Sequence, residues 1–376
     1  MEQRPFKIAV SQPVGRETAR ACDKTTGFGA VSKRRVMATT IKDVAKLAGV
    51  SISTVSLVIN DNPVVKLATR KKVLDVIEKC NFKPNQNARS LVTKSSKIIG
   101  VIRVIDENNP SPFLFNSNVD TYMSEMLWNI ESGIQANGYS MLLDWYNILE
   151  PVKLPSLLDI NKVDGIISVG GMLTNEYNAA LGQSGLPTVM IGARSPNVDY
   201  VDVDSEKAIF LAVNYMIEQG NRRIAFINNT DLTQSSSRKH TGFKKAVEGK
   251  DIKTWEAFCS FSGQRAYDAF REIWERGEEK PTAVVCAHDC MAIGVMRYMN
   301  DHGLGCPDDI SVIGFEDGLL AEHSIPALST VRVHKAQLGT EACEVLFNRI
   351  RNNRARQVKR IIEPELIIRN SIRSKN

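Results

Sequence analysis

Seven short apolar runs, rich in β-branched residues, recur between Ile98 and Phe315, and amphipathic stretches of helical length separate them. Strands that alternate with helices form βαβ units, in which helices cover both faces of a parallel sheet. Seven strands are many for one sheet, and the pattern divides into two similar halves near Val203. We therefore predict an α/β region of two doubly wound parallel-sheet subdomains with a cleft between them. The runs are IIGVIRV, YSMLLDW, VDGIISV, PTVMIG, RRIAFIN, PTAVVCA and ISVIGF.

Between Thr40 and about Asn81 the apolar residues recur at helical spacing instead. Two short helices, IKDVAKLA and ISTVSLVI, are expected on either side of a turn at Gly49. Thr40 directly precedes the first helix and Ser51 the second, and both residues are suited to helix capping. A third helix, TRKKVLDVIEKC, keeps its apolar side chains on one face. Two short helices joined by a tight glycine turn are typical of a helix-turn-helix. We therefore predict an all-α helix-turn-helix module at the N-terminal end.

Charge is divided unevenly along the chain. Residues 1–37 carry eight basic and three acidic side chains, residues 38–97 carry eleven and four, and the whole chain has a net charge of +6. The remaining 279 residues therefore have a net charge of −6. A basic N-terminal part on an acidic body is typical of a chain that meets phosphate with one end only. A solvated basic surface is the alternative that charge alone leaves open.

Residues 1–36 show no apolar periodicity, and we interpret residues 1–37 as a disordered basic extension. Met37 directly precedes the patterned sequence, so the extension is a native arm, the product of a misplaced translation start, or a cloning remnant. The chain has no run of ~18 apolar residues and no secretory signal. We therefore expect a cytoplasmic protein without a membrane partner, in which the seven cysteines stay reduced.

The motifs that carry enzyme chemistry are missing from the sequence. It contains no glycine-rich phosphate loop, no GxSxG elbow and no paired carboxylate motif, so we expect neither an enzyme nor a cofactor. Cys286-x-His288-x-Cys290 has a metal-like spacing. The expected strand-to-helix transition would send these side chains in different directions, and a fourth ligand is not evident, so we predict no metal site.

The string TIKDVAKLAGVSISTVSLVIN closely resembles the start of the lactose-repressor (LacI/GalR) family, and FKPNQNARSL resembles the hinge helix of that family. Over about residues 39–370 further motifs follow in the family's order, namely VDGII, RRIAFI, DCMAIG, PDDISVIGFED, IPALSTVR and IIEPELIIR. The resemblance implies a repressor that binds a near-palindromic operator in double-stranded DNA as a homodimer. Its periplasmic-binding-protein-like sensor would bind a small effector. A periplasmic-type sugar-binding protein is the alternative, but it would need a secretion signal and would lack the helix-turn-helix.

The resemblance also implies the domain boundaries. We expect the helix-turn-helix at 38–84, a hinge helix and linker at 85–97, and an effector-binding and dimerisation domain at 98–376. Its N-subdomain would comprise about 98–203 and 333–362, and its C-subdomain about 204–332 and 363–376.

In this family the second helix of the helix-turn-helix enters the major groove, and the positions of Ile52, Ser53 and Leu57 read bases. Leu57 departs from the family, where arginine is common and pairs with guanine. Leucine offers only apolar contact to a thymine methyl, so we predict an operator without that guanine; the alternative is that Leu57 packs on the module's own surface. The full set of expected contacts is Thr40, Ser51, Ile52, Ser53, Thr54, Ser56, Leu57 and Asn60.

The hinge segment is the second expected DNA contact. Its helix, QNARSLV, is too short to be stable alone, and the resemblance implies that it folds on DNA beside its dimer mate. Leu91 would then enter a base step of the minor groove and kink the DNA. Asn85 and Ala88 complete the expected hinge contacts.

The resemblance places effector contacts at five positions between the two subdomains, near the carboxyl ends of the strands. Phe261 would stack on a ring, and Glu316 would accept hydrogen bonds. His288 stands where asparagine is frequent, Lys239 replaces arginine, and Val104 replaces a small polar residue. These departures suggest a sugar-like or acidic metabolite unlike a simple neutral hexose. The alternative is a cleft that binds no small molecule.

Overall fold

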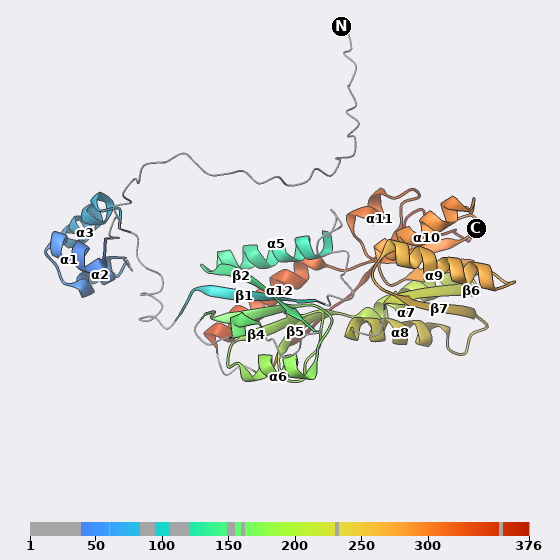
Figure 1. Ribbon diagram of the computed structural model, residues 1–376, viewed down its shortest axis with the longest axis horizontal. Coiled ribbons are helices and arrows are strands. Elements are labelled where there is room, and N and C mark those ends of the chain that lie inside the picture. The colour runs from blue at the N-terminus through green and yellow to red at the C-terminus, as the bar shows by residue number, and fades with distance from the viewer. Residues whose placement is uncertain are drawn as a thin grey trace, which may run out of the picture. The chain divides into compact units, whose positions relative to one another are not determined.

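A computed structural model gives the fold of the chain (Figure 1). Among the residues that it describes, no helix is long and apolar enough to cross a membrane. Contacts divide the chain into two compact units, Met1–Pro84 and Asn85–Asn376; we call them the helical unit and the α/β unit. The described residues are 39–59, 61–82, 95–105, 121–148, 155–158, 162–229, 233–352 and 356–375.

The helical unit confirms the predicted helix-turn-helix. Thr40 and Asp43 form a capping box at the start of the first helix, and Gly49 ends that helix with φ of 63°, a left-handed conformation that glycine adopts without strain. Val55 and Val73 are fully buried in a shared core, and burying each valine contributes about 1.5–3 kcal/mol. The helices are α1 (Ile41–Ala48), α2 (Ile52–Ile59) and α3 (Leu67–Lys79).

The α/β unit contains two sheets of six strands, each the centre of one lobe (Figure 1). In the first lobe all strands are parallel, in the order β11-β5-β4-β3-β1-β2. These strands are β1 (Ile98–Ile105), β2 (Ser140–Asn147), β3 (Gly165–Val169), β4 (Thr188–Ile191), β5 (Asp199–Val203) and β11 (Lys359–Ile362). The helices of this lobe are α5 (Thr121–Ala136), the short η1 (Ser156–Leu158), α6 (Asn175–Gln183) and α12 (Lys335–Arg351).

The second lobe has the strand order β12-β10-β9-β8-β6-β7, in which only β12 runs antiparallel to its neighbour, β10. These strands are β6 (Arg223–Asn229), β7 (Lys253–Cys259), β8 (Ala283–Cys286), β9 (Ser311–Glu316), β10 (Ser329–Arg332) and β12 (Glu365–Ile367). The helices of this lobe are α7 (Ser205–Glu218), α8 (Gln234–Val247), α9 (Gly263–Arg276), α10 (Asp289–Asp301) and α11 (Leu319–His323).

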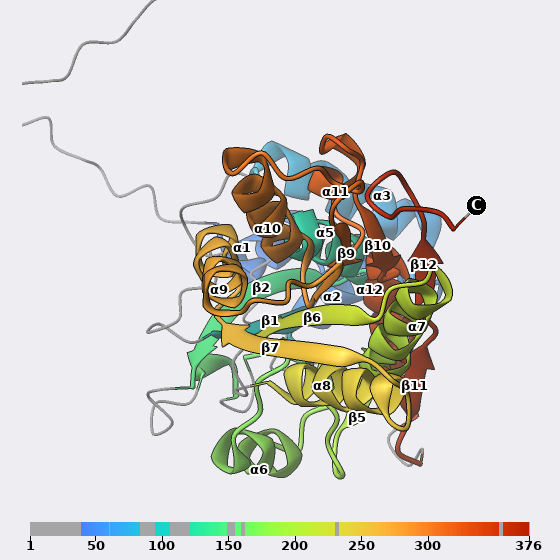
Figure 2. The ribbon, with the colours of Figure 1, turned by 90° about the vertical axis from the view of Figure 1, so that its right-hand side faces the viewer.

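The second sheet is buried on both faces, as its continuous apolar runs require. Ile224 and Phe226 pack in one core with residues of α7 and α8, whereas Ala225 and Ile227 pack in another with residues of α9 and α10. Figure 2 shows these two helix pairs on opposite sides of β6. The predicted fold of two doubly wound parallel-sheet subdomains is therefore confirmed.

All seven predicted runs form strands, namely β1, β2, β3, β4, β6, β8 and β9. Five further strands were not predicted from the sequence. In β5, DYVDV, acidic residues interrupt the apolar pattern, and β7, KTWEAFC, is a polar strand at the sheet edge. The remaining three, β10, β11 and β12, have four residues or fewer. Such strands lack the apolar run that marks a central strand.

Candidate DNA-binding and effector sites

The first turn of α2 presents two of the predicted base-reading side chains to solvent. Ile52 is 45% exposed, and Ser53 is also exposed. The opposite face of α2 packs against the core of the helical unit, where Val55 and Val58 are buried. An exposed isoleucine beside an exposed serine, at the start of a helix whose opposite face is buried, gives a short surface that can enter a groove.

Ser51 and Thr54 hold the start of α2 in place. The amide of Thr54 donates to Ser51 Oγ over 3.1 Å, and the two hydroxyl oxygens lie 2.9 Å apart. The amides of a helix N-terminus attract anions, so Ser51 and Thr54, two of the predicted DNA contacts, have surroundings suited to a phosphate group. Thr40 has a similar role in α1, where its hydroxyl donates to Asp43 over 2.7 Å.

Ser56 and Leu57 are half-buried in the next turn of α2. Among the described residues, Leu57 is not one of the apolar side chains packed against the core of the helical unit. Four other predicted DNA contacts lie outside the described residues, and they stay predictions: Asn60, Asn85, Ala88 and Leu91.

Four of the five predicted effector residues come together at the carboxyl ends of the second sheet. Phe261 follows β7, His288 directly precedes α10, and Glu316 ends β9. The ring of Phe261 lies 5.2 Å from that of His288, and His288 pairs through Nε2 with Glu316. Lys239 of α8 lies beside them, with Nζ 5.9 Å from the Phe261 ring.

Lys239 points into the lobe instead of outward. Its side chain is buried, Nζ donates to the carbonyl of Ala287 over 2.7 Å, and Nζ lies 3.7 Å from the Phe315 ring. Burial disfavours the charged form and lowers the pKa of Lys239 to about 7, although the carboxylates of Glu316 and Asp289 oppose this shift. At neutral pH this lysine therefore carries only part of a positive charge.

Asp289, the first residue of α10, adds a second carboxyl group to the one that Glu316 places near His288. It accepts hydrogen bonds from the amide of Gly318 over 2.8 Å and from the hydroxyl of Thr330 over 2.6 Å. Burial raises the pKa of Asp289 to about 7, and the nearby charge of Glu316 adds to the effect. A Cβ at Gly314 would lie 2.2 Å from Asp289 Oδ1, so this packing requires glycine there.

Val104, the fifth predicted effector residue, lies in the first lobe at the end of β1, and its side chain is buried. It packs against Gly170, where a Cβ would lie 2.9 Å from that of Val104. No described contact joins Val104 to the other four residues.

A polar network that joins the two lobes was not predicted. Asp202 of β5 binds Arg194 of the first lobe over 2.8 Å and Arg238 of α8 over 2.7 Å. The side chain of Gln234 in α8 exchanges two hydrogen bonds with the backbone of Arg194. The backbone amide of Gln234 donates to the carbonyl of Gly171 over 3.0 Å. An acidic residue inside a buried strand, as in DYVDV, is the sequence signal that marks such a partnered carboxylate.

Comparisons with known proteins agree with this arrangement. Residues 40–85 match the model of bacterial regulatory proteins of the lacI family, and residues 213–372 match a periplasmic binding protein-like domain. The chain is 32% identical to HTH-type transcriptional repressor PurR of Vibrio campbellii over 347 residues, which is 90% of this chain and 99% of that protein. It is 33% identical to the repressor of the same name from Haemophilus influenzae over 346 residues, which is 89% of this chain and 99% of that one.

The chain belongs to the lacI family of bacterial regulatory proteins. It is a transcriptional repressor with a helix-turn-helix and an effector domain, and the expectation that it is not an enzyme is confirmed. Among solved structures, the Lac repressor dimer bound to operator and the anti-inducer ONPF has the same fold, with a TM-score of 0.77 at 24% identity over 89% of this chain and 99% of that one. The cellobiose complex of the transcriptional regulator CelR is also similar, with a TM-score of 0.65 at 26% identity over 89% and 99%.

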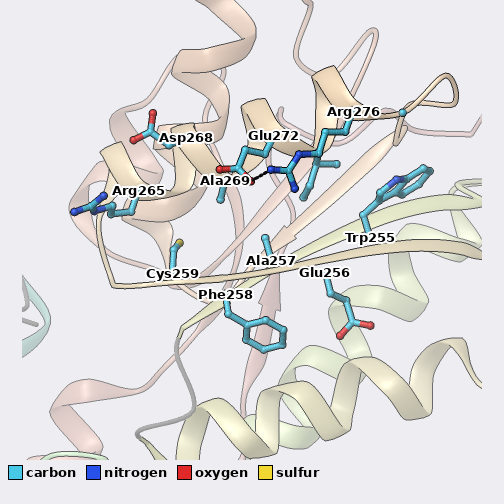
Figure 3. Close-up of a pocket in the computed structure, with 12 residues that line it drawn as sticks. Trp255, Glu256, Ala257, Phe258, Cys259, Arg265, Asp268, Ala269, Glu272 and Arg276 are labelled. Atoms are coloured by element: carbon cyan, nitrogen blue, oxygen red, sulfur yellow. Dashed lines mark ion pairs between the residues drawn. The ribbon is translucent and has the colours of Figure 1, made fainter.

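Within this lacI-family fold, a cavity of about 610 Å³ lies outside the predicted effector site (Figure 3). It lies between the edge strand β7 and helix α9 of the second lobe. Trp255, Ala257 and Cys259 form one wall, while Arg265 and Glu272 belong to the other. None of the predicted effector residues lines this cavity. Among the described residues, no cluster of His, Cys, Asp or Glu is arranged to hold a metal ion.

Proposed function

We propose that this repressor binds a near-palindromic operator as a homodimer, with α2 of each copy in the major groove. The observation that carries the proposal is the exposed pair Ile52 and Ser53 on a helix whose opposite face is buried, within a helix-turn-helix of the lacI family. Groove readout needs side chains that reach base edges from a fixed helix. The hinge residues, which lie outside the described part, are proposed to add the minor-groove contact.

The proposed dimer is favoured by large apolar side chains that are exposed on α5 and on the edge strand β2 of the first lobe. Trp128 of α5 is 69% exposed and Trp145 of β2 is 63% exposed. Leu142 and Leu143, also on the edge strand β2, are exposed as well. Large exposed apolar patches commonly mark protein interfaces, and tryptophan is enriched in them. We propose that exposed side chains of this set pack against the same side chains of a second copy.

We propose an uncharged, hydroxyl-bearing effector at the ends of the second sheet. The two cationic side chains that suggested an acidic effector are already engaged, Lys239 with Ala287 and His288 with Glu316. Phe261 offers an apolar ring to such a ligand. Asn229, at the end of β6, is buried, and its Oδ1 has no hydrogen-bond partner in the described part of the chain. That oxygen is suited to accept from an effector hydroxyl.

The network around Asp202 is proposed to report effector binding to the DNA-binding unit. Arg238 and Gln234 belong to the second lobe, and Asp202 and Arg194 belong to the first. An effector that binds one lobe arrangement better than another shifts the balance between them, and its coupling to operator affinity is then reciprocal.

Operator binding tests the proposal directly. Titration of a selected operator with the full chain should give a two-copy complex, and Ile52→Ala with Ser53→Ala should weaken it about tenfold or more, since a good base contact contributes about 1–3 kcal/mol. Leu74→Ala is a matched control, because Leu74 is 48% exposed on α3. Equal affinities of the double variant and the control would contradict the proposal.

A further inference from the structure

Two successive residues at the end of β9 have an unusual backbone conformation. Glu316, the last residue of β9, has φ of 120°, and Asp317 has φ of 58°. Residues with a Cβ rarely adopt positive φ, and such conformations persist only where the surrounding structure holds them. They gather at ligand-binding and switch segments. Glu316 carries a carboxylate of the proposed effector site, so the contacts that hold this backbone also determine where that carboxylate lies.

A buried lysine contacts the carbonyl groups of both residues. Lys335 is the first residue of α12, and it is 6% exposed. Its Nζ donates to the carbonyl of Asp317 over 3.1 Å, and the carbonyl oxygen of Glu316 lies 3.5 Å from the same atom. The Glu316 carbonyl also accepts from the amide of Val333 over 3.3 Å. A buried ammonium needs acceptors, and here the two carbonyls belong to the two residues with positive φ.

The same amine is also bound to the first lobe. Oε2 of Glu125, in α5, lies 3.3 Å from Lys335 Nζ. Helix α12 packs closely on α5, since a Cβ at Gly339 would lie 3.0 Å from the carbonyl oxygen of Met126. Lys335 is therefore held by helices of the first lobe, whereas the strand that it contacts, β9, lies in the second sheet. Its contacts cross from one lobe to the other.

The segment after β9 has further contacts within the second lobe. The carboxylate of Asp317 pairs with Arg332 and with Arg369, each over 2.7 Å. The amide of Gly318 donates to Asp289 over 2.8 Å. These contacts fix the side chain of Asp317 and the backbone that follows it. The carbonyls of the two residues with positive φ are instead held by the amine that comes from α12.

We propose that Lys335 is a positioning residue of the effector site, which holds the backbone of Glu316 from the first lobe and thereby directs the Glu316 carboxylate toward His288. A change in the arrangement of the two lobes alters the distance between the amine and the carbonyls, so the position of the carboxylate depends on that arrangement. An effector that binds Glu316 then favours the arrangement in which the contact is made. The inference rests on the proposed effector site for its regulatory role, but its test needs no effector.

The ring of His288 reports where the carboxylate lies. Burial would lower the pKa of His288, but the paired Glu316 carboxylate raises it well above its ordinary value. Lys335→Met removes the amine, and the pKa of His288 should then fall by about one pH unit or more, a tenfold change in the protonation equilibrium, because the carboxylate moves away from the ring. Loss of a nearby positive charge alone would raise this pKa. The direction of the change therefore separates positioning from a direct charge effect.

NMR titration of the full chain with isotope-labelled histidine measures this pKa, and His288→Asn assigns the signal. Lys335→Arg keeps a cationic donor and should retain the raised pKa. Lys207→Met is the matched control, because Lys207 also pairs with a glutamate, Glu363, but at an exposed position, and it should leave the pKa of His288 unchanged.

Circular dichroism verifies that each variant is folded. Lys335→Gln, which keeps a polar group in the buried position, replaces Lys335→Met if that variant does not fold, and the same fall in the pKa of His288 is expected. A pKa that is unchanged or raised in the folded variant, or a control that lowers it equally, would overturn the proposal. A ligand screen that finds no effector at this site would count against the proposed function alone, because the titration is carried out without ligand.

Discussion

The surface of α2 and the predicted effector site differ in what their side chains already contact. Ile52 is 45% exposed and Ser53 faces solvent, so DNA can reach both without displacing protein. Lys239 and Glu316 are 4% and 3% exposed, and each contacts a partner within the second lobe. A ligand at the effector site must therefore compete with internal contacts, and that competition reduces its net affinity. The same competition would couple the proposed effector binding to a change within the lobe.

The largest expected effect is at the DNA-binding surface. Ile52→Asp places a negative charge among phosphates and should reduce operator affinity to the nonspecific level, a loss of ~10³-fold or more. Leu74→Asp on α3 is the charge-matched control and should retain most of the affinity. Fluorescence anisotropy at fixed salt measures both. If both variants bind the operator equally, α2 is not the surface of the helical unit that contacts the operator.

Removing one member of the effector site should destabilise the fold. Glu316→Ala leaves His288 without its buried carboxylate, and breaking such a pair costs about 3 kcal/mol. Urea unfolding of the α/β unit within the full chain measures the loss. Glu363→Ala is the control, because Glu363 forms an exposed pair with Lys207, and solvent screens such a pair so that it contributes little to stability. A cost at Glu316 no greater than at Glu363 would show that the effector site is not internally paired.

The buried amine gives a pH signature. The pKa of Lys239 is about 7 in the folded chain against 10.5 as its ordinary value, so between these values the unfolded chain binds a proton that the folded chain does not. Stability relative to Lys239→Met should therefore rise with pH from 7 to 9, by roughly 1 kcal/mol per pH unit. Denaturant titrations of both proteins at several pH values measure the difference. A difference that stays flat or falls would mean that Lys239 reaches solvent.

A smaller change tests the reading of bases by Leu57. Leu57→Arg should add a preference for guanine at one position of each half-site, by about 1–3 kcal/mol. Selection from random DNA with the wild-type and variant chains compares the two directly. If the wild-type chain already selects a strong guanine at that position, Leu57 does not set the specificity.

The fold could be predicted from the sequence wherever burial leaves a continuous or periodic apolar pattern. The central strands β3 and β8 and the core face of α2 are examples, because their side chains must avoid water. The edge strand β7 and the acidic β5 were missed, since one is partly solvated and the other carries a carboxylate whose partners lie on distant segments.

The sequence allowed us to predict which residues of the candidate effector site lie near one another, but not the direction or the charge of their side chains. Phe261, His288 and Glu316 were expected near one another, and the structure brings them together. The inward direction of Lys239 and the lobe-bridging contacts of Asp202 depend on tertiary packing between α8 and its neighbours. These contacts join segments that are far apart in the sequence, so they could not be predicted from local sequence. The positive charge that we expected at Lys239 is therefore larger than the structure supports.

Selection of bound DNA from a random pool, with the stoichiometry of the selected complex determined by light scattering, tests the central claim most directly. The account predicts two copies of the chain on a near-palindromic site whose half-sites lose affinity in the Ile52→Asp variant. A single copy on an asymmetric site, or no enrichment over nonspecific DNA, would contradict it.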